Sequence, residues 1–231
     1  MFDAFTSILD WVGIVAFAMT GALVASRKEM DIVGFILLGT ATGIGGGTIR
    51  DTLLGVFPIF WIADPSYLVV CILVSGVTFF VAHIPQSRYR LLLWVDAIGV
   101  AVFAVTGAET ALAVGANPIV AIAMGVVTAT FGGIIRDILG GESPVILRRE
   151  VYVTAALAGA CLFVILSILS LPREACLGSG LAAAATIRFA ALRWNWSLPR
   201  YQSRAGREGS AAPPSDTRVD SLMKGDLERE G

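Results

Sequence analysis

The chain has 231 residues, of which 56% are hydrophobic and 15% are charged, with a net charge of -1 and a mean hydropathy of +0.78. This balance excludes an ordinary water-soluble domain. Apolar stretches recur along the chain, each near the ~20 residues needed to cross about 30 Å of hydrocarbon. The composition therefore predicts an all-α polytopic membrane protein.

Apolar runs between turn signals predict seven transmembrane helices. In chain order, these helices cover residues 11–25, 32–54, 67–84, 91–114, 119–139, 151–171 and 175–192. The segment before the first helix contains Asp3 and Asp10 but no Lys or Arg, unlike a cleaved signal peptide, so we expect the first span to be retained. Residues 198–231 are rich in Ser, Gly, Pro and charge, which predicts a disordered aqueous tail.

One sequence offset relates the two halves of the apolar region. The segment DWVGIVAFAMTGA from Asp10 is similar to DAIGVAVFAVTGA from Asp96, 86 residues later (96 - 10 = 86). The same offset aligns GIGGGTIRD, which ends at residue 51, with FGGIIRD, which ends at residue 137, and it also aligns Pro58 with Pro144. A shared offset across separate motifs indicates an internal duplication.

The duplicated unit contains three helices. An odd number of spans brings the second copy into the membrane from the opposite face, so we predict two inverted three-helix repeats plus a seventh helix (3+3+1). The first repeat covers residues 1–86, the inverted second repeat 87–172, the seventh transmembrane helix 173–197 and the cytoplasmic tail 198–231.

Basic residues predict the orientation of the chain. In the seven-helix prediction, most Lys and Arg residues between helices fall on one side of the membrane, including Arg27, Lys28, Arg88 and Arg90. By the positive-inside rule, the N-terminus lies outside and the C-terminus in the cytoplasm. We therefore expect a multi-pass protein of the cell inner (plasma) membrane.

Each half places glycines, an arginine and an aspartate inside an apolar run. The predicted site residues are Gly45, Gly46, Gly47, Arg50, Asp51, Gly132, Gly133, Arg136 and Asp137. Glycines lower helix propensity and invite a kink, and a helix in hydrocarbon is interrupted only where protein or water satisfies the freed backbone groups. Interrupted helices at matching positions of two repeats are typical of a transport site. We therefore predict that both helices are interrupted and line a path.

The side chains around the glycines suggest what passes along this path. Hydroxyls offer oxygen ligands to a monovalent cation without holding it tightly, and the predicted lining hydroxyls are Thr42, Thr48, Thr128 and Thr130. Arg50 and Asp51 project about 100° apart around a helix, so they need not pair with each other. Three alternatives remain: the glycines form a packing surface, the threonines bond back to their own helix, and the arginines extend to headgroups.

Other polar residues are weaker candidates. Asp10 and Asp96 are repeat-equivalent near predicted helix starts, where N-capping and an ion contact compete as explanations. Glu109 has no acidic counterpart and faces either the cavity or the aqueous end of its span. The three cysteines, Cys71, Cys161 and Cys176, lack CxxC spacing and His83 is the only histidine, so we expect no tightly bound metal. We also expect no cofactor, no nucleic-acid partner and no enzymatic activity.

The paired glycine motifs, each followed by a proline, resemble those of prokaryotic trimeric intracellular cation (TRIC) channels. The resemblance covers roughly residues 10–192. It implies a homotrimer in a lipid membrane, with one hourglass-shaped pore per subunit that conducts potassium and other monovalent cations such as sodium. By matching motifs, it implies pore roles for Gly45, Gly46, Gly47, Arg50, Gly132, Gly133 and Arg136. FGGIIRD is not the lysine-rich phosphoinositide-binding motif of animal members.

Two functional hypotheses follow. The leading one is a passive monovalent-cation channel in which Arg50 and Arg136 gate the constriction. Similar sequences have also been labelled glycine transporters, so a carrier of a small solute such as glycine is the alternative. A non-transporting scaffold would explain the duplication but not the charged motifs.

Overall fold

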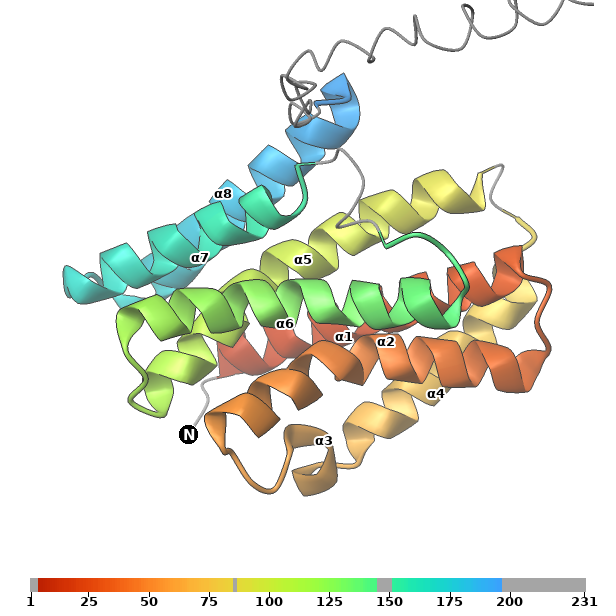
Figure 1. The fold of residues 1–231 in the computed structure, drawn as a ribbon, viewed down its shortest axis with the longest axis horizontal. Helices are drawn as coiled ribbons and strands as arrows, with labels where there is room; N and C mark the ends of the chain where they lie inside the picture. Colours follow the sequence, from red (N-terminus) through yellow and green to blue (C-terminus); the bar gives the residue numbers. More distant parts are fainter. Residues whose placement is uncertain (1–3, 85–86, 145–150, 197–231) are drawn as a thin grey trace, which may run out of the picture. The chain divides into compact units, whose positions relative to one another are not determined.

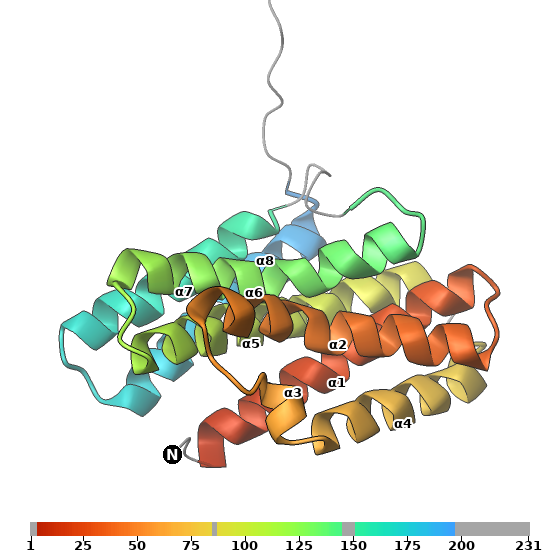
Figure 2. The same ribbon diagram turned by 60° about the horizontal axis from the view of Figure 1, so that its bottom comes forward.

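The computed structural model describes residues 4–84, 87–144 and 151–196, which form eight helices. They are α1 (Ala4–Arg27), α2 (Ile32–Leu54), α3 (Phe60–Ala63), α4 (Ser66–Val81), α5 (Arg88–Ala113), α6 (Pro118–Leu139), α7 (Val153–Ile168) and α8 (Arg173–Trp194). Figures 1 and 2 show α1 and α5 at the centre, with the other helices packed around them. The two central helices are also the most buried of the long apolar helices.

The helices repeat with the sequence offset. A shift of 86 residues superposes the bounds of α1, α2 and α4 on those of α5, α6 and α7, within two residues at each end. Figure 1 shows α1 and α5, and likewise α2 and α6, lying side by side and running in opposite directions. The two three-helix units are therefore inverted relative to each other, and α8 is additional.

Reciprocal contacts join the two units at the centre. The rings of Phe17 and Phe103, which are equivalent under the offset, pack edge to face with centroids 5.2 Å apart. A Cβ atom at Gly13 would lie 2.6 Å from the Phe103 ring, and one at Gly99 would lie 2.5 Å from the Phe17 ring. Each glycine thus makes room for the aromatic ring of the other repeat.

Five of the described helices are long and apolar enough to cross a membrane: α1, α2, α5, α6 and α8. The helices α4 and α7 are apolar but shorter, with 16 residues each. Their outward faces carry exposed aliphatic and aromatic side chains, including Leu73, Val77, Phe80 and Ile165. Such a surface suits contact with hydrocarbon rather than water.

Several predicted boundaries need correction. The helices α1 and α5 begin at Ala4 and Arg88, ahead of the predicted residues 11 and 91, and Ser87 caps α5 by accepting a hydrogen bond from the Arg90 amide. The short helix α3 was not predicted, because four residues give no readable periodicity. The predicted tail, residues 198–231, lies outside the described residues.

Candidate functional site

The two glycine motifs meet where α2 packs on α6. A Cβ atom added at Gly46 would lie 2.2 Å from the carbonyl oxygen of Thr128, and one added at Gly132 would lie 2.6 Å from the carbonyl oxygen of Thr42. The two contacts are equivalent under the 86-residue offset. Because both obstacles are backbone atoms, no side-chain rotation would relieve them, and the glycines permit a close approach of two helix backbones.

Both helices are continuous through their glycines. The α-helical pattern runs unbroken from Ile32 to Leu54 and from Pro118 to Leu139. The predicted interruption of the two helices is therefore wrong. The glycines serve close packing instead: Gly45 lies against Ile135, Gly47 against Phe60 and Gly133 against the Tyr152 hydroxyl.

Arg136 lies in a fully buried polar cluster. Its Nη1 donates to Asp96 Oδ1 at 2.7 Å and to Thr20 Oγ1 at 3.1 Å, while its Nε donates to Asp137 Oδ1 at 2.9 Å. The side chains of Arg136 and Asp96 are both 0% exposed. The guanidinium thus lies between two carboxylates, and its removal would break two buried ion pairs in the membrane interior.

Arg50, the equivalent residue in the first repeat, has different surroundings. Its Nε and Nη2 donate to Asp51 Oδ1 at 2.8 and 2.7 Å, and Asp51 Oδ2 accepts from the Phe60 amide at 3.0 Å. Asp10 is the counterpart of Asp96, but within the described chain it forms no ion pair with Arg50. The first repeat thus keeps the Arg-Asp neighbour pair and lacks the second carboxylate contact.

A cavity of about 260 Å³ lies beside Arg50 and Asp10. Arg50 and Asp10 both line it, together with Gly43 and Gly47 of α2 and with Tyr67 at the start of α4. The cavity is large enough for several water molecules or for one small solute. It therefore gives the α2 motif an open space that the buried α6 motif does not share.

The outer rim of the cavity carries one further carboxylate. Asp64, exposed between α3 and α4, lines the cavity and accepts hydrogen bonds from the Ser66 amide and hydroxyl. These bonds favour the charged form and lower the pKa of the Asp64 carboxyl from its ordinary value. An anionic group thus stands at the edge of the space in front of Arg50.

The structure settles two local predictions about the charged residues. Arg50 pairs with Asp51, and Arg136 with Asp137, because the long arginine side chain folds across the helix surface to its neighbour. Asp10 and Asp96 are not N-caps, because α1 and α5 begin several residues earlier and place both carboxylates inside the helices. Asp96 instead forms an ion pair with Arg136, and Asp10 lines the cavity.

The four predicted lining hydroxyls bond back to their own helices. The acceptors are the carbonyls four residues earlier: Leu38 for Thr42, Ile44 for Thr48, Met124 for Thr128 and Val126 for Thr130. None of these threonines lines the cavity in front of Arg50. Trp61 of α3 adds a hydrogen bond to the Thr48 hydroxyl at 3.0 Å.

Glu109 belongs to a separate cluster. It accepts hydrogen bonds from the Thr6 hydroxyl and from Arg173, the first residue of α8, and its side chain is largely buried. Arg173 also donates to the Thr6 hydroxyl at 2.6 Å. This cluster ties α8 to α1 and α5, and Glu109 does not line the Arg50 cavity.

The chain has relatives of known name. A family model described as glycine transporter matches residues 7–83 and 93–167. The UPF0126 inner membrane protein YadS of Escherichia coli K12 is 41% identical over 195 residues, which are 84% of this chain and 94% of YadS. A TRIC trimeric intracellular cation channel orthologue from Rhodobacter sphaeroides is 63% identical with a TM-score of 0.83, covering 84% of this chain and all of that one.

The chain belongs to the TRIC channel family. A second solved structure, a prokaryotic TRIC channel, agrees with a TM-score of 0.80 at 30% identity over 85% of this chain. The predicted resemblance is thus confirmed, and membership places the chain among channels rather than enzymes. The family match to this TRIC chain has one gap, at residues 84–92, which follow α4 and include the first residues of α5, and it ends at residue 167, near the end of α7.

Sequence reasoning missed some residues of this TRIC site. The buried partner of Arg136 is Asp96, and the signal was present, because Asp10 and Asp96 share the offset of the arginines. The aromatic residues Phe60 and Tyr67, which border the Arg50 cavity, carried no such signal. Their place depends on how α3 folds back onto α2, which no local pattern predicts.

Proposed function

We propose that this TRIC family member is a passive monovalent-cation channel with an ion path in each subunit, between α2 and α6. The observation that carries the proposal is that two equivalent arginines have different surroundings. In the first repeat Arg50 lines a cavity, whereas in the second repeat Arg136 is buried and bound to Asp96. The two arginines lie on α2 and α6, which run antiparallel and pack closely at Gly46 and Gly132. In this conformation the path is shut at Arg136.

The charges favour cations over anions. Asp10 and Asp64 line the Arg50 cavity, and the guanidinium that lines it is paired with Asp51, so the formal charge of this group of residues is negative. The carboxylates of Asp96 and Asp137 lie beside Arg136 at the second site. A negative passage in a medium of low dielectric concentrates cations and repels anions. Potassium and sodium are the permeating ions that we propose.

Opening requires Arg136 to leave Asp96. The two groups are held by a charge-assisted hydrogen bond, and both are removed from water. A shift of the guanidinium toward Asp137 alone would free one Asp96 oxygen for a passing cation. Because Arg50 and Arg136 are charged and lie within the membrane-spanning helices, we propose that they respond to voltage.

The membrane arrangement is part of the proposal. Seven helices would span the bilayer as 3+3+1, with repeats at residues 1–86 and 87–172, a seventh helix at 173–197 and a cytoplasmic tail at 198–231. Support comes from the inverted units of the fold and from Arg27, Lys28 and Arg88, which lie together where α1 ends and α5 begins. YadS is named as an inner membrane protein and the Rhodobacter protein as trimeric, which supports a homotrimer in the inner membrane. The positive-inside rule supports an N-terminus on the outside.

Recording from purified trimers in a planar bilayer tests the channel. Unitary steps should appear in symmetric potassium chloride, and in a salt gradient the reversal potential should lie near the potassium equilibrium potential. Replacing potassium by sodium should retain a current. Intact trimers without unitary steps, or with a reversal potential near that of chloride, would reject the proposal.

A small-solute carrier is the second candidate. The matching family model is described as glycine transporter, and the Arg50 cavity presents both a guanidinium and the Asp10 carboxylate. Such a pair complements the carboxylate and ammonium groups of a zwitterion such as glycine. Saturable glycine uptake into liposomes, lost in Asp10→Asn and occurring without unitary currents, would select the carrier instead.

A further inference from the structure

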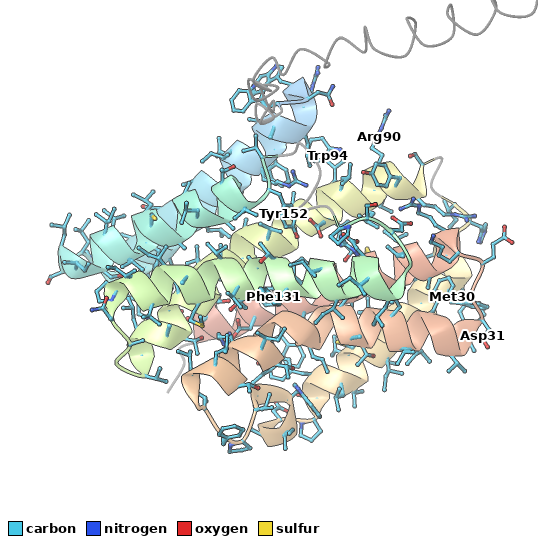
Figure 3. All side chains as sticks on the ribbon, viewed as in Figure 1. Met30, Asp31, Arg90, Trp94, Phe131 and Tyr152 are labelled. Carbon is cyan, nitrogen blue, oxygen red and sulfur yellow. The ribbon has the colours of Figure 1, made fainter. Side chains whose placement is uncertain are left out.

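A second cavity lies away from the proposed ion path, between the start of α5 and the end of α8. Its volume is about 730 Å³. The residues that matter for its chemistry are three arginines, Arg90, Arg188 and Arg193, and three aromatic residues, Tyr89, Trp94 and Trp196. Figure 3 shows Arg90 and Trp94 projecting from the same side of α5, as expected for residues four apart on a helix.

Among the described residues that line this cavity, the charged ones are all arginines. No described carboxylate lines it, and neither Arg90 nor Arg193 forms an ion pair with another described residue. Both of these arginines are exposed, whereas Arg188 is fully buried and lies over the Tyr152 ring, with its Cζ 4.9 Å from the ring centroid. Guanidinium groups gathered around one space favour a phosphate or another oxyanion, which they bind through paired N–H groups.

The walls of the cavity are apolar and aromatic. Trp94, with 38% of its surface exposed, stacks on Phe189 of α8, and Trp196 stacks on Trp194. One turn further along α5, Ile98 is 41% exposed and continues the apolar surface away from the arginines. Tryptophan is enriched where a membrane meets water. The arginines of the cavity would therefore lie at the level of the lipid headgroups, and Ile98 would lie at the level of the hydrocarbon.

We propose that this cavity binds the phosphate of an anionic phospholipid headgroup. Arg90 and Arg193 donate to the phosphate oxygens from α5 and α8, and Trp94 and Ile98 contact the glycerol and the first part of an acyl chain. The apolar track beside the arginines distinguishes a lipid from free phosphate, which needs no such surface. A bound lipid would join the ends of α5 and α8, and none of these residues lines the cation path.

Native mass spectrometry of purified trimers, exchanged into nanodiscs of phosphatidylcholine with or without phosphatidylglycerol, tests this site. Wild-type protein should retain phosphatidylglycerol in preference to phosphatidylcholine. Each arginine near an anionic surface contributes about 1 kcal/mol, or about fivefold in affinity. The double variant Arg90→Gln with Arg193→Gln should therefore lower retention by about 25-fold. Lys28→Gln is the matched control, because it removes one exposed charge at the same end outside the cavity and should change retention little.

A thermal-shift series with phosphatidylglycerol micelles and with inorganic phosphate separates the two sources of phosphate. The lipid should raise the melting temperature of the wild type and not that of the double variant, whereas inorganic phosphate should have no such effect. Equal stabilisation by inorganic phosphate, equal retention of both lipids, or an equal loss in Lys28→Gln would overturn the proposal. The double variant in phosphatidylcholine should carry the same cation current as the wild type, because its substitutions lie outside the proposed ion path. A loss of lipid retention can therefore be told apart from a failure of the channel proposal.

Discussion

The Arg50 and Arg136 sites carry the same residues in equivalent places, yet one borders a cavity and the other is sealed. Arg136 is 0% exposed and bound to Asp96, whereas Arg50 is 8% exposed and separated from Asp10. The difference comes from outside the motif. Tyr152, beneath Arg188 of the additional helix α8, packs on Gly133, while short α3 brings Phe60 to Gly47. A duplication thus supplies equivalent groups, and its unequal surroundings decide which half is closed.

The largest difference between the two sites should appear when the arginines are removed. Arg136→Ala breaks the buried ion pairs with Asp96 and Asp137, and breaking a buried pair typically costs about 3–5 kcal/mol. Arg50→Ala leaves Asp51 with the hydrogen bond from the Phe60 amide and enlarges the cavity that Arg50 lines, so it should cost less, about 1–3 kcal/mol. Melting temperatures of the detergent-purified trimers measure both, and equal losses would show that the two sites are not differently buried.

Packing at the α2–α6 contact is the next most sensitive feature. Gly46→Ala places a methyl group against the Thr128 backbone and should destabilise the protein by about 3 kcal/mol. Gly76→Ala on α4 is the control, since no atom lies within 4 Å of its added Cβ, and alanine should favour that helix by about 1 kcal/mol. If both variants melt at the wild-type temperature, the two backbones are not in close contact.

The two aspartates should affect conduction in opposite ways. Asp96→Asn weakens the hold on Arg136 and should raise the open probability in bilayer recordings. Asp10→Asn removes a charge from the cavity and should lower the unitary conductance about twofold, the effect of one unit charge ~8 Å away in water. A matching change in both variants would mean that Asp10 and Asp96 have the same role.

The smallest effect concerns the rim of the cavity. The Ser66 hydrogen bonds lower the pKa of Asp64, so the carboxylate stays charged to a lower pH than usual. The charged Asp64 carboxylate stabilises the folded protein at pH values above its pKa in the unfolded chain. This contribution is lost as the pH falls through the lower pKa that Asp64 has in the folded protein. Ser66→Ala removes one bond, and its conductance should begin to fall at a higher pH than that of the wild type. Identical pH profiles would remove Asp64 from the entry to the path.

The sequence was informative where a pattern repeats. The offset of 86 predicts the equivalence of α2 with α6 and of Gly46 with Gly132, and the helices follow it closely. The offset does not distinguish a glycine that interrupts a helix from a glycine that permits close packing. That difference depends on which helix packs against the glycine, and the local sequence does not show this. The Arg136–Asp96 pair joins residues 40 apart in sequence, so its formation depends on how α5 and α6 pack.

Access to the Arg50 cavity tests the central claim most directly. Ser7 lines the cavity on α1, and Ser7→Cys would place a thiol there. Native Cys71 and Cys176 are buried, and the partly exposed Cys161 does not line this cavity. A positively charged, thiol-specific reagent should reduce the unitary cation current of this variant and leave the equally treated wild type unchanged. Complete modification of the introduced thiol, verified by mass spectrometry, without any change in current would contradict an ion path through this cavity.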